Sequence, residues 1–215
     1  MCIRDSHNSE ERVLQLQNLY GDNICYLARA DFTDTHSVQE LFDDVWSWKN
    51  KIDILINNAA LIEPVESIHD ISEKDLIKAM QVNFIAPFLL AQKVLQKMNH
   101  EGYGRIASIS SIAVKYSGSP QMAHYMASKA ALEAGMLALS KHASTSGVLV
   151  NVIRAGVTKT SAQQRIGRDD LSARESLIPI GRAAEPSEIA EVVAFLVSPL
   201  NTYMTGAIVP VAGGE

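Results

Sequence analysis

The chain has 215 residues, of which 47% are hydrophobic and 20% charged, and its formal net charge at pH 7 is −5. These are ordinary values for a globular domain, whereas a nucleic-acid-binding surface needs a basic face that this sequence lacks. Its two cysteines are too few for a disulfide framework or a metal site, and its apolar stretches are too short to span a membrane. We therefore expect one soluble, cytoplasmic domain over residues 1–215, without metal and without a nucleic-acid or membrane partner.

Apolar periodicity alternates between the helical and the extended pattern along the chain. It predicts strands over 24–30, 52–56, 105–109, 148–153 and 207–211. Before and between them it predicts helices over 9–19, 37–48, 123–145 and 187–197, and helical structure over 72–98, as one helix or two, interrupted near Pro87. Strands separated by helices indicate parallel βαβ units. We therefore expect an α/β fold with a Rossmann-like, doubly wound parallel sheet in three α/β/α layers.

The beginning of the sequence departs from such a fold. A dinucleotide-binding sheet opens with a strand, a Gly-rich turn and a helix whose amino end binds the pyrophosphate. No G-x-x-x-G-x-G pattern precedes residue 31, and the first glycine is Gly21. Residues 1–6 also match the pattern of the second strand poorly. We therefore expect a truncated sequence that lacks the first β-strand and the Gly-rich turn, with a doubtful junction over residues 1–6.

Polar residues gather where the predicted strands end. They are Asp31, Asn57, Asn58, Ser110, Ser111 and several of residues 155–160. Ligands of doubly wound folds bind beyond the carboxyl ends of the strands. The coincidence supports a binding site at this edge of the sheet, although loop polarity alone accounts for part of it.

Tyr125 and Lys129 form the pattern Y-x-x-x-K inside a predicted helix. Side chains four residues apart share one helix face and can meet one ligand. A phenol has an ordinary pKa near 10, and a nearby ammonium lowers it. Tyrosine then comes within range of general acid–base catalysis. The same spacing also arises by chance at the edge of an amphipathic helix, so the neighbouring residues decide between the two interpretations.

Two neighbours favour the catalytic interpretation. Ser111 follows a predicted strand, where its hydroxyl could bind a substrate carbonyl; it could equally be a turn serine, and Ser110 is as simple a candidate. Asn83 interrupts an apolar helical stretch. A buried amide needs hydrogen-bond partners, so Asn83 is expected to tether water or backbone, or to make a contact between helices.

These residues belong to a longer run of ordered motifs. The run comprises Asn57-Asn58-Ala59-Ala60, Asn83, Gly104-Arg105-Ile106, Ser111, the Y-x-x-x-K of Tyr125 and Lys129, Ile180-Gly181-Arg182 with Glu185-Pro186, and Thr205-Gly206. In this order and at these separations the chain resembles the short-chain dehydrogenase/reductase (SDR) family over residues 9–214, including its 3-oxoacyl-ACP reductase-like members. The N-N-A-A stretch is similar to that family's N-N-A-G.

The resemblance implies an NAD(P)-dependent oxidoreductase that transfers a hydride between a nicotinamide cofactor and a carbonyl or secondary alcohol. It implies that Tyr125 is the proton donor in reduction and the base in oxidation, and that Lys129 lowers its pKa and holds the nicotinamide ribose. Ser111 would polarise the substrate carbonyl, and Asn83 would support a water-linked proton path. The implied cofactor-binding residues are Asp31 and Phe32 at the adenine, Asn58, Ala59 and Ala60 along the cofactor, Thr158 and Thr160 near the carboxamide, and Tyr125 and Lys129.

Three positions depart from the family's pattern. Ala60 replaces a glycine, Ala155 replaces a proline, and Ala212 replaces an aspartate near the end of the chain. The loss of the proline's φ restraint is expected to loosen the loop that carries Thr158 and Thr160. None of the three changes removes a reacting group.

Several alternatives remain open from the sequence. An acidic residue after the second strand favours NAD and a basic one NADP, and the adjacent Arg4 and Asp5 point in opposite directions. The substrate is a 3-oxoacyl thioester, a sugar, a polyol or another small alcohol, because the polar segment 161–179 identifies none of them. A non-catalytic scaffold or inactive fragment is the alternative function, since fold alone does not establish activity. We expect little activity and weak cofactor binding from the 215-residue chain itself.

The resemblance also implies a homo-oligomer, either a tetramer or a dimer. Its interfaces would use the helical stretches 86–98 and 123–142 and the C-terminal strand.

Overall fold

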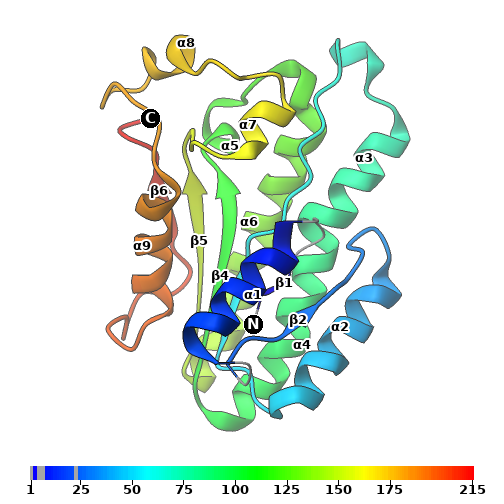
Figure 1. The fold of residues 1–215 in the computed structure, drawn as a ribbon, viewed down its shortest axis with the longest axis vertical. Helices are drawn as coiled ribbons and strands as arrows, with labels where there is room; N and C mark the ends of the chain where they lie inside the picture. Colours follow the sequence, from blue (N-terminus) through cyan, green and yellow to red (C-terminus); the bar gives the residue numbers. More distant parts are fainter. Residues whose placement is uncertain (1, 4–7, 22–23) are drawn as a thin grey trace. The chain divides into compact units, whose positions relative to one another are not determined.

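The computed structural model describes residues 2–3, 8–21 and 24–215. The chain forms two compact units, Met1–Ile52 and Asp53–Glu215, and each has its own parallel sheet (Figure 1). The single domain over residues 1–215 stays a prediction.

The first unit is a short strand–helix–strand element followed by a helix. Strand β1 (Cys2–Ile3) pairs in parallel with β2 (Leu27–Ala28), and α1 (Asn8–Tyr20) connects them. Helix α2 (Thr35–Lys49) follows, with the Asp34 side chain accepting from the His36 N–H at its start. The strand Cys2–Ile3 lies within residues 1–6, whose junction stays doubtful as a prediction. Arg4 and Asp5 lie outside the described residues.

The second unit contains a four-stranded parallel sheet. Its order is β3 (Ile54–Asn57), β4 (Gly104–Ser111), β5 (Val148–Ala155) and β6 (Ile208–Val211). The parallel pairing confirms the predicted α/β fold. It also brings the last residues of β3, β4 and β5 to one edge, because neighbouring parallel strands point the same way.

Helices cover both faces of the central strands β4 and β5. Helix α9 (Pro186–Val197) packs its apolar face on Ala107 and Ile153. Helix α6 (Ala123–Ala143) contacts the opposite face, where its Glu133 binds Ser110. Figure 1 shows these two helices on either side of the strands. The alternation of Ala107 and Ser110 between the two faces follows from the two-residue period of a strand.

Further helical elements complete the second unit. They are η1 (Ile68–Asp70), α3 (Glu73–Met80), η2 (Gln81–Ile85), α4 (Ala86–Glu101), α5 (Ala113–Tyr116), η3 (Pro120–Met122), η4 (Ser144–Ser146), α7 (Ser161–Arg165) and α8 (Ser172–Glu175). The helical stretch predicted over 72–98 is interrupted at η2, a π-helical turn, and not at Pro87. Pro87 is the second residue of α4 and directly follows this turn.

One sharp connection fixes where β5 begins. Gly147 has a φ of +73°, and a Cβ built on it would lie 2.5 Å from the carbonyl oxygen of Gly102. Both the left-handed backbone and this close approach require a residue without a side chain. Gly167 has a similar φ of +72° but open space around it, so it shares only the first requirement.

We predict that Gly147→Ala destabilises the fold more than Gly167→Ala does. The second change costs roughly 1–2 kcal/mol for the left-handed backbone, and the first adds about 1–3 kcal/mol for the backbone overlap. Urea unfolding of both variants, followed by circular dichroism, measures the difference. Equal losses of unfolding free energy in the two variants would contradict this interpretation of Gly147.

Candidate active site

The tyrosine and lysine of the Y-x-x-x-K pattern lie together at the carboxyl end of β4. Tyr125 and Lys129 are buried side chains, 7% and 2% exposed, one turn apart on α6. The hydroxyl of Ser111, the last residue of β4, lies close enough to the Tyr125 phenol to lower its pKa. The Lys129 Nζ donates to the carbonyl oxygen of Ile109 at 2.7 Å. The structure therefore brings together three of the four residues that the sequence predicted as catalytic.

The two adjacent serines differ in their contacts. The Ser110 hydroxyl is buried and donates to the carboxylate of Glu133 at 2.7 Å. The Ser111 hydroxyl is half-buried, and its oxygen accepts from the Ala113 N–H at 3.2 Å. Ser110 uses its hydroxyl hydrogen on Glu133, whereas the Ser111 hydroxyl interacts with Tyr125, so Ser111 is the serine that lies beside the phenol.

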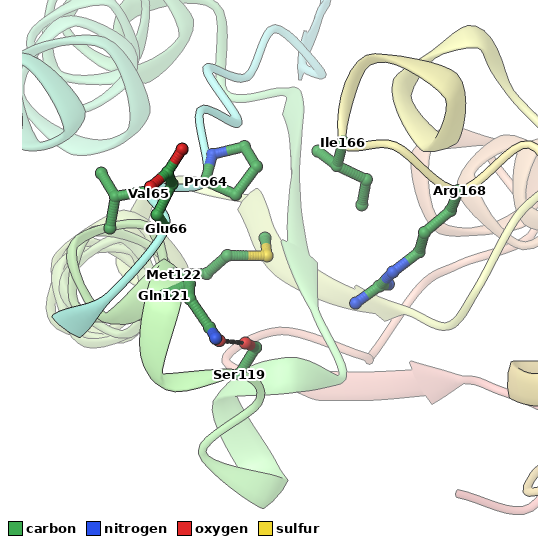
Figure 2. Close-up of a pocket in the computed structure, with 8 residues that line it drawn as sticks. All are labelled: Pro64, Val65, Glu66, Ser119, Gln121, Met122, Ile166 and Arg168. Atoms are coloured by element: carbon green, nitrogen blue, oxygen red, sulfur yellow. Dashed lines mark hydrogen bonds between the residues drawn. The ribbon is translucent and has the colours of Figure 1, made fainter.

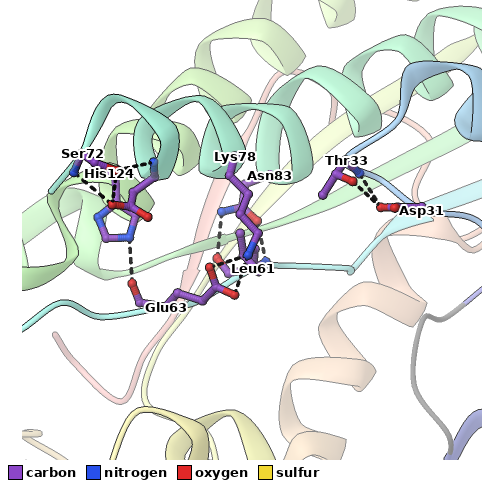
Figure 3. A network of polar contacts seen from close by, with 9 residues as sticks. Asp31, Thr33, Leu61, Glu63, Ser72, Lys78, Asn83 and His124 are labelled. Carbon is purple, nitrogen blue, oxygen red and sulfur yellow. Dashed lines mark hydrogen bonds and ion pairs between the residues drawn. The ribbon is translucent and has the colours of Figure 1, made fainter.

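Asn83 links three segments that are distant in sequence. Its side chain is fully buried in the π-helical turn η2. The Oδ1 accepts from the Leu61 N–H at 2.7 Å, and the Nδ2 donates to the Leu61 carbonyl at 3.0 Å and to the Ser128 hydroxyl at 2.9 Å. Figure 3 shows Asn83 beside Leu61. Asn83 therefore makes both expected contacts, one with backbone and one with another helix.

The loop after β3 is held at two points. Asn83 binds Leu61, and the Nε2 of His124 lies 2.8 Å from the carbonyl oxygen of Glu63, so it donates there (Figure 3). The preceding residues Asn58, Ala59 and Ala60 are exposed. They are the predicted cofactor-lining residues of this loop. The loop to which these three residues belong is therefore attached to helix α6 through His124, the residue before Tyr125.

Asn57 has a structural role in the same region. Its side chain is 7% exposed, and the Nδ2 donates to the Ser108 hydroxyl at 3.1 Å and to the Pro87 carbonyl at 3.4 Å. It thus joins the end of β3 to β4 and α4, and does not face outward as the following Asn58 does.

The segment after β5 is tightly connected despite Ala155. The Ile112 N–H donates to the Ala155 carbonyl at 2.9 Å, and the Gly156 N–H donates to the Val211 carbonyl at 2.9 Å. A Cβ on Gly156 would lie 2.7 Å from the Cα of Ala212. The loosening expected from the missing proline is therefore offset by backbone hydrogen bonds on both sides.

The two predicted threonines follow directly. Thr158 is half-buried, its hydroxyl donates to the Gly156 carbonyl at 3.0 Å, and its backbone forms a parallel bridge with Ala184. Thr160 is exposed and precedes α7. Both lie just past the carboxyl end of β5, as the sequence predicted.

Asp31 and Phe32 belong to the first unit, in the loop after β2. The Asp31 carboxylate is exposed and accepts from the N–H and the hydroxyl of Thr33, at 2.8 and 2.7 Å. These two hydrogen bonds hold the pKa of Asp31 below its usual range. The adenine-binding roles of Asp31 and Phe32 stay predictions.

Burial dominates the electrostatics of the site. It lowers the pKa of Lys129 from 10.5 to about 8. It also raises the pKa of Tyr125, and the hydrogen bond with Ser111 lowers it by a smaller amount. The net shift is upward because desolvation, which favours the neutral phenol, is the larger of these two effects. Tyr125 is thus protonated at neutral pH, which is the form that donates a proton. The expected lowering by the Lys129 ammonium stays a prediction.

A cavity of about 370 Å³ lies beside the amino end of α6. Its lining residues are Pro64, Val65, Glu66, Ser119, Gln121, Met122, Ile166 and Arg168 (Figure 2). Met122 is the residue before α6 begins, one turn ahead of Tyr125. The cavity is therefore built from loops that follow β3, β4 and β5, the segments that end at the candidate site.

Three contacting residues escaped the sequence analysis. Ser128 bonds Asn83, and Glu133 forms an ion pair with Arg154. The sequence does carry a signal for Glu133 and Arg154. Glu133 lies four residues after Lys129 and shares its helix face, and Arg154 interrupts a β-branched strand. Which residue each would meet was not readable from the sequence.

The described part of the chain contains no group of three or more His, Cys, Asp or Glu residues placed to hold a metal ion. Among the same residues, no helix combines the length and the apolar composition that crossing a membrane requires.

Comparison with known proteins places this fold and site in a class. A family model described as Enoyl-(Acyl carrier protein) reductase matches residues 1–215. The chain belongs to the short-chain dehydrogenase/reductase family, a family of oxidoreductases whose cofactor is NAD or NADP.

Individual relatives agree with this assignment. The chain is 34% identical over 213 residues to the 3-oxoacyl-[acyl-carrier-protein] reductase of Rickettsia felis, covering 97% of this chain and 84% of that protein. It is 30% identical over 200 residues to the reductase of the same name from Aquifex aeolicus, covering 93% and 79%. A putative NAD(P) dependent gluconate 5-dehydrogenase from Beutenbergia cavernae, solved with bound NADP, superposes with a TM-score of 0.90 at 25% identity, covering 99% and 84%.

We predict that Lys129→Met is more stable than the unaltered chain at pH 7, by about 1–3 kcal/mol. The change in pKa from 10.5 to about 8 corresponds to a desolvation cost of about 3 kcal/mol, and the lost hydrogen bond to Ile109 offsets about 1 kcal/mol of the gain. Below pH 8 the lysine is charged in the folded and unfolded states, so the full cost is present. Between pH 8 and 10.5 the folded state binds fewer protons, and the cost disappears as pH rises.

Denaturant unfolding of both proteins from pH 7 to 10.5 measures this difference. The stability gap is expected to narrow steadily above pH 8. A variant that is less stable than the parent at pH 7 would contradict the assigned cost of burying the ammonium.

Proposed function

We propose that the site transfers a hydride between NAD(P) and a carbonyl or secondary alcohol, with Tyr125 as general acid and base. The observation that carries the proposal is a buried phenol that lies beside the Ser111 hydroxyl and one turn from the buried Lys129 ammonium. These groups provide a proton, an orienting hydroxyl and a cation at one point. Membership of an oxidoreductase family supports the same reaction class.

The reaction needs one hydride and one proton for each carbonyl that is reduced. The nicotinamide cofactor, when bound, supplies or accepts the hydride at the carbonyl carbon. Ser111 orients the carbonyl oxygen with its hydroxyl hydrogen. Tyr125 donates its phenolic proton to the same oxygen as negative charge develops there. Because its pKa is raised, Tyr125 carries this proton at neutral pH before the transfer.

Lys129 stabilises the phenolate that remains after proton transfer. With its pKa at about 8, the side chain is mostly charged at neutral pH. Its ammonium has three N–H donors, one of which is used on Ile109. A buried ammonium with further donors suits the hydroxyls of a nicotinamide ribose, so the residues present fit this half of the cofactor. In oxidation the same cation favours deprotonation of Tyr125.

The remaining predicted contacts complete the proposed cofactor path. Their assigned places are Asp31 and Phe32 at the adenine, Asn58, Ala59 and Ala60 along the cofactor, and Thr158 and Thr160 near the carboxamide. Asn83 positions the loop of Asn58 through its two bonds to Leu61. A water-linked proton path through Asn83 is part of the proposal.

A 3-oxoacyl thioester is the substrate class we favour. The 34% identity to a protein named 3-oxoacyl-[acyl-carrier-protein] reductase supports it. The cavity between Met122 and Arg168 is the proposed entry for the substrate, because it lies next to the turn that carries Tyr125. The non-catalytic scaffold is the alternative function.

We predict that Tyr125→Phe lowers kcat for reduction by about 10²–10⁴-fold, the usual contribution of a positioned acid. Cofactor affinity is expected to stay within about twofold, because the ring is kept. Reduction of acetoacetyl thioesters is followed by absorbance with NADPH and NADH at saturation, and binding by fluorescence. Near-normal turnover by Tyr125→Phe would rule out its role as acid. Because little activity is expected from the 215 residues themselves, the ratio of kcat between Tyr125→Phe and the unaltered chain is the deciding measurement.

We also propose a homo-oligomer that uses the surface around the C-terminal strand. Strand β6 is an edge of its sheet, and unpaired strand edges invite pairing with another chain. Phe195, Leu200 and Tyr203 nearby are exposed, the last two by 79% and 94%. The large exposed apolar side chains of the described residues do not include any from α4 or α6, so the C-terminal surface is the better candidate.

We predict that Tyr203→Asp shifts the sedimentation mass toward that of one chain. A charge placed in an apolar contact must be desolvated without a partner. Tyr20→Asp, at an exposed tyrosine on α1, is the matched control and is expected to leave the mass unchanged. A single-chain mass for the unaltered protein would contradict the oligomer.

A further inference from the structure

A buried charge cluster lies directly behind the candidate active site. Glu133 is 4% exposed. Its Oε1 accepts from the Ser110 hydroxyl at 2.7 Å and from the Nε of Arg154 at 2.8 Å, and its Oε2 accepts from the Nη2 of Arg154 at 2.6 Å. This is a bidentate arginine–carboxylate pair, the geometry that fixes both partners most strictly. The proposed proton transfer does not use it.

The cluster continues a series of contacts between α6 and β4. Tyr125, Lys129 and Glu133 are spaced one turn apart on the helix. They bind Ser111, Ile109 and Ser110, which are consecutive residues at the end of the strand. Three successive turns of α6 therefore contact Ile109, Ser110 and Ser111, and these contacts fix the position of the Ser111 hydroxyl.

The same cluster also includes the neighbouring strand. Arg154 of β5 lies opposite Ser110 of β4 in the sheet, and Ala155 lies opposite Ser111. The Ala155 carbonyl accepts from the Ile112 N–H, directly after Ser111. Glu133 thus joins the carboxyl ends of two strands to the helix that carries the phenol.

Stability alone explains this arrangement poorly. Glu133 is buried and Arg154 half-buried, and an ion pair with a buried carboxylate often contributes little net stability, because removing the charge from water costs about as much as the attraction gains. An apolar pair of similar volume would fill the same space without that cost. What the pair does supply is fixed geometry, and a displacement of about 1 Å in an active site can cost about 10²-fold in rate.

We propose that Glu133 is a positioning residue for the reaction. Together with Arg154 it holds Ser110, and through Ser110 it sets the distance and angle between the hydroxyls of Ser111 and Tyr125. The inference rests on the proposed function of Tyr125 and Ser111, and it adds residues that touch neither substrate nor cofactor.

Two sets of variants separate positioning from stability. Ser110→Ala removes one hydrogen bond and leaves the ion pair, and Ser110→Thr restores the hydroxyl. The double variant Glu133→Leu with Arg154→Met replaces the ion pair by apolar side chains of similar size, so that neither charge is left alone. Each is measured for kcat, for KM of both substrates, and for the urea midpoint.

We expect Ser110→Ala and the double variant to lower kcat by about 10- to 100-fold, with cofactor KM within about twofold and urea midpoints near that of the parent. Ser110→Thr is expected to recover most of the rate. The pH profile of alcohol oxidation in Ser110→Ala is expected to move to higher pH, since the Ser111 bond that lowers the pKa of Tyr125 is weakened. A purely structural role would move the urea midpoint and not this profile.

Tyr125→Phe, measured beside these variants, distinguishes two failures. If Tyr125→Phe keeps its turnover, the proposed function itself is wrong. If Tyr125→Phe loses turnover while Ser110→Ala and the double variant keep the parent's kcat and pH profile, only the positioning role of Glu133 is overturned.

Discussion

The burial of a lysine ammonium against the end of a β-strand is the constraint on which the second unit's site depends. Lys129 is 2% exposed, and its ammonium donates to the Ile109 carbonyl. Placing this charge among apolar neighbours opposes folding, because desolvation lowers its pKa to about 8. The apolar contacts of α6 with the sheet must outweigh this cost. A group that destabilises the fold and is nevertheless held at a strand end agrees with the role in catalysis that we propose for Lys129.

The same cost explains how the neighbours of Lys129 are arranged. Buried polar groups are tolerated when each has a partner, and the side of α6 that faces β4 follows this rule. Ser128 bonds Asn83, and Glu133 bonds Ser110 and Arg154. These bonds also fix positions, since a bidentate pair tolerates little displacement. Polar side chains that are expensive to bury therefore give the site its rigidity.

Sequence patterns predicted those features that depend on local spacing. Four-residue spacing placed Tyr125 and Lys129 on one helix face, and strand ends located Ser111 and Thr158, because both periodicities are properties of the backbone alone. The π-helical turn at Gln81–Ile85 was missed, since Pro87 gave the stronger local signal for an interruption. The sequence also did not reveal which residue pairs with Glu133 or in which direction the pKa of Tyr125 is shifted. Both depend on which distant segments meet and how much water they exclude.

The π-helical turn shows how a local irregularity serves a distant site. A π turn adds one residue to a helix and rotates the side chains that follow it, and such turns are frequent at functional sites. Here it aims Asn83 inward, where one amide binds both backbone groups of Leu61 and the Ser128 hydroxyl of α6. The loop carrying Asn58 and the helix carrying Tyr125 are thereby tied to the same side chain. Asp would lose the two donated bonds and Leu all three, so asparagine at this position follows from the geometry of the three segments and not from helix propensity, which disfavours it.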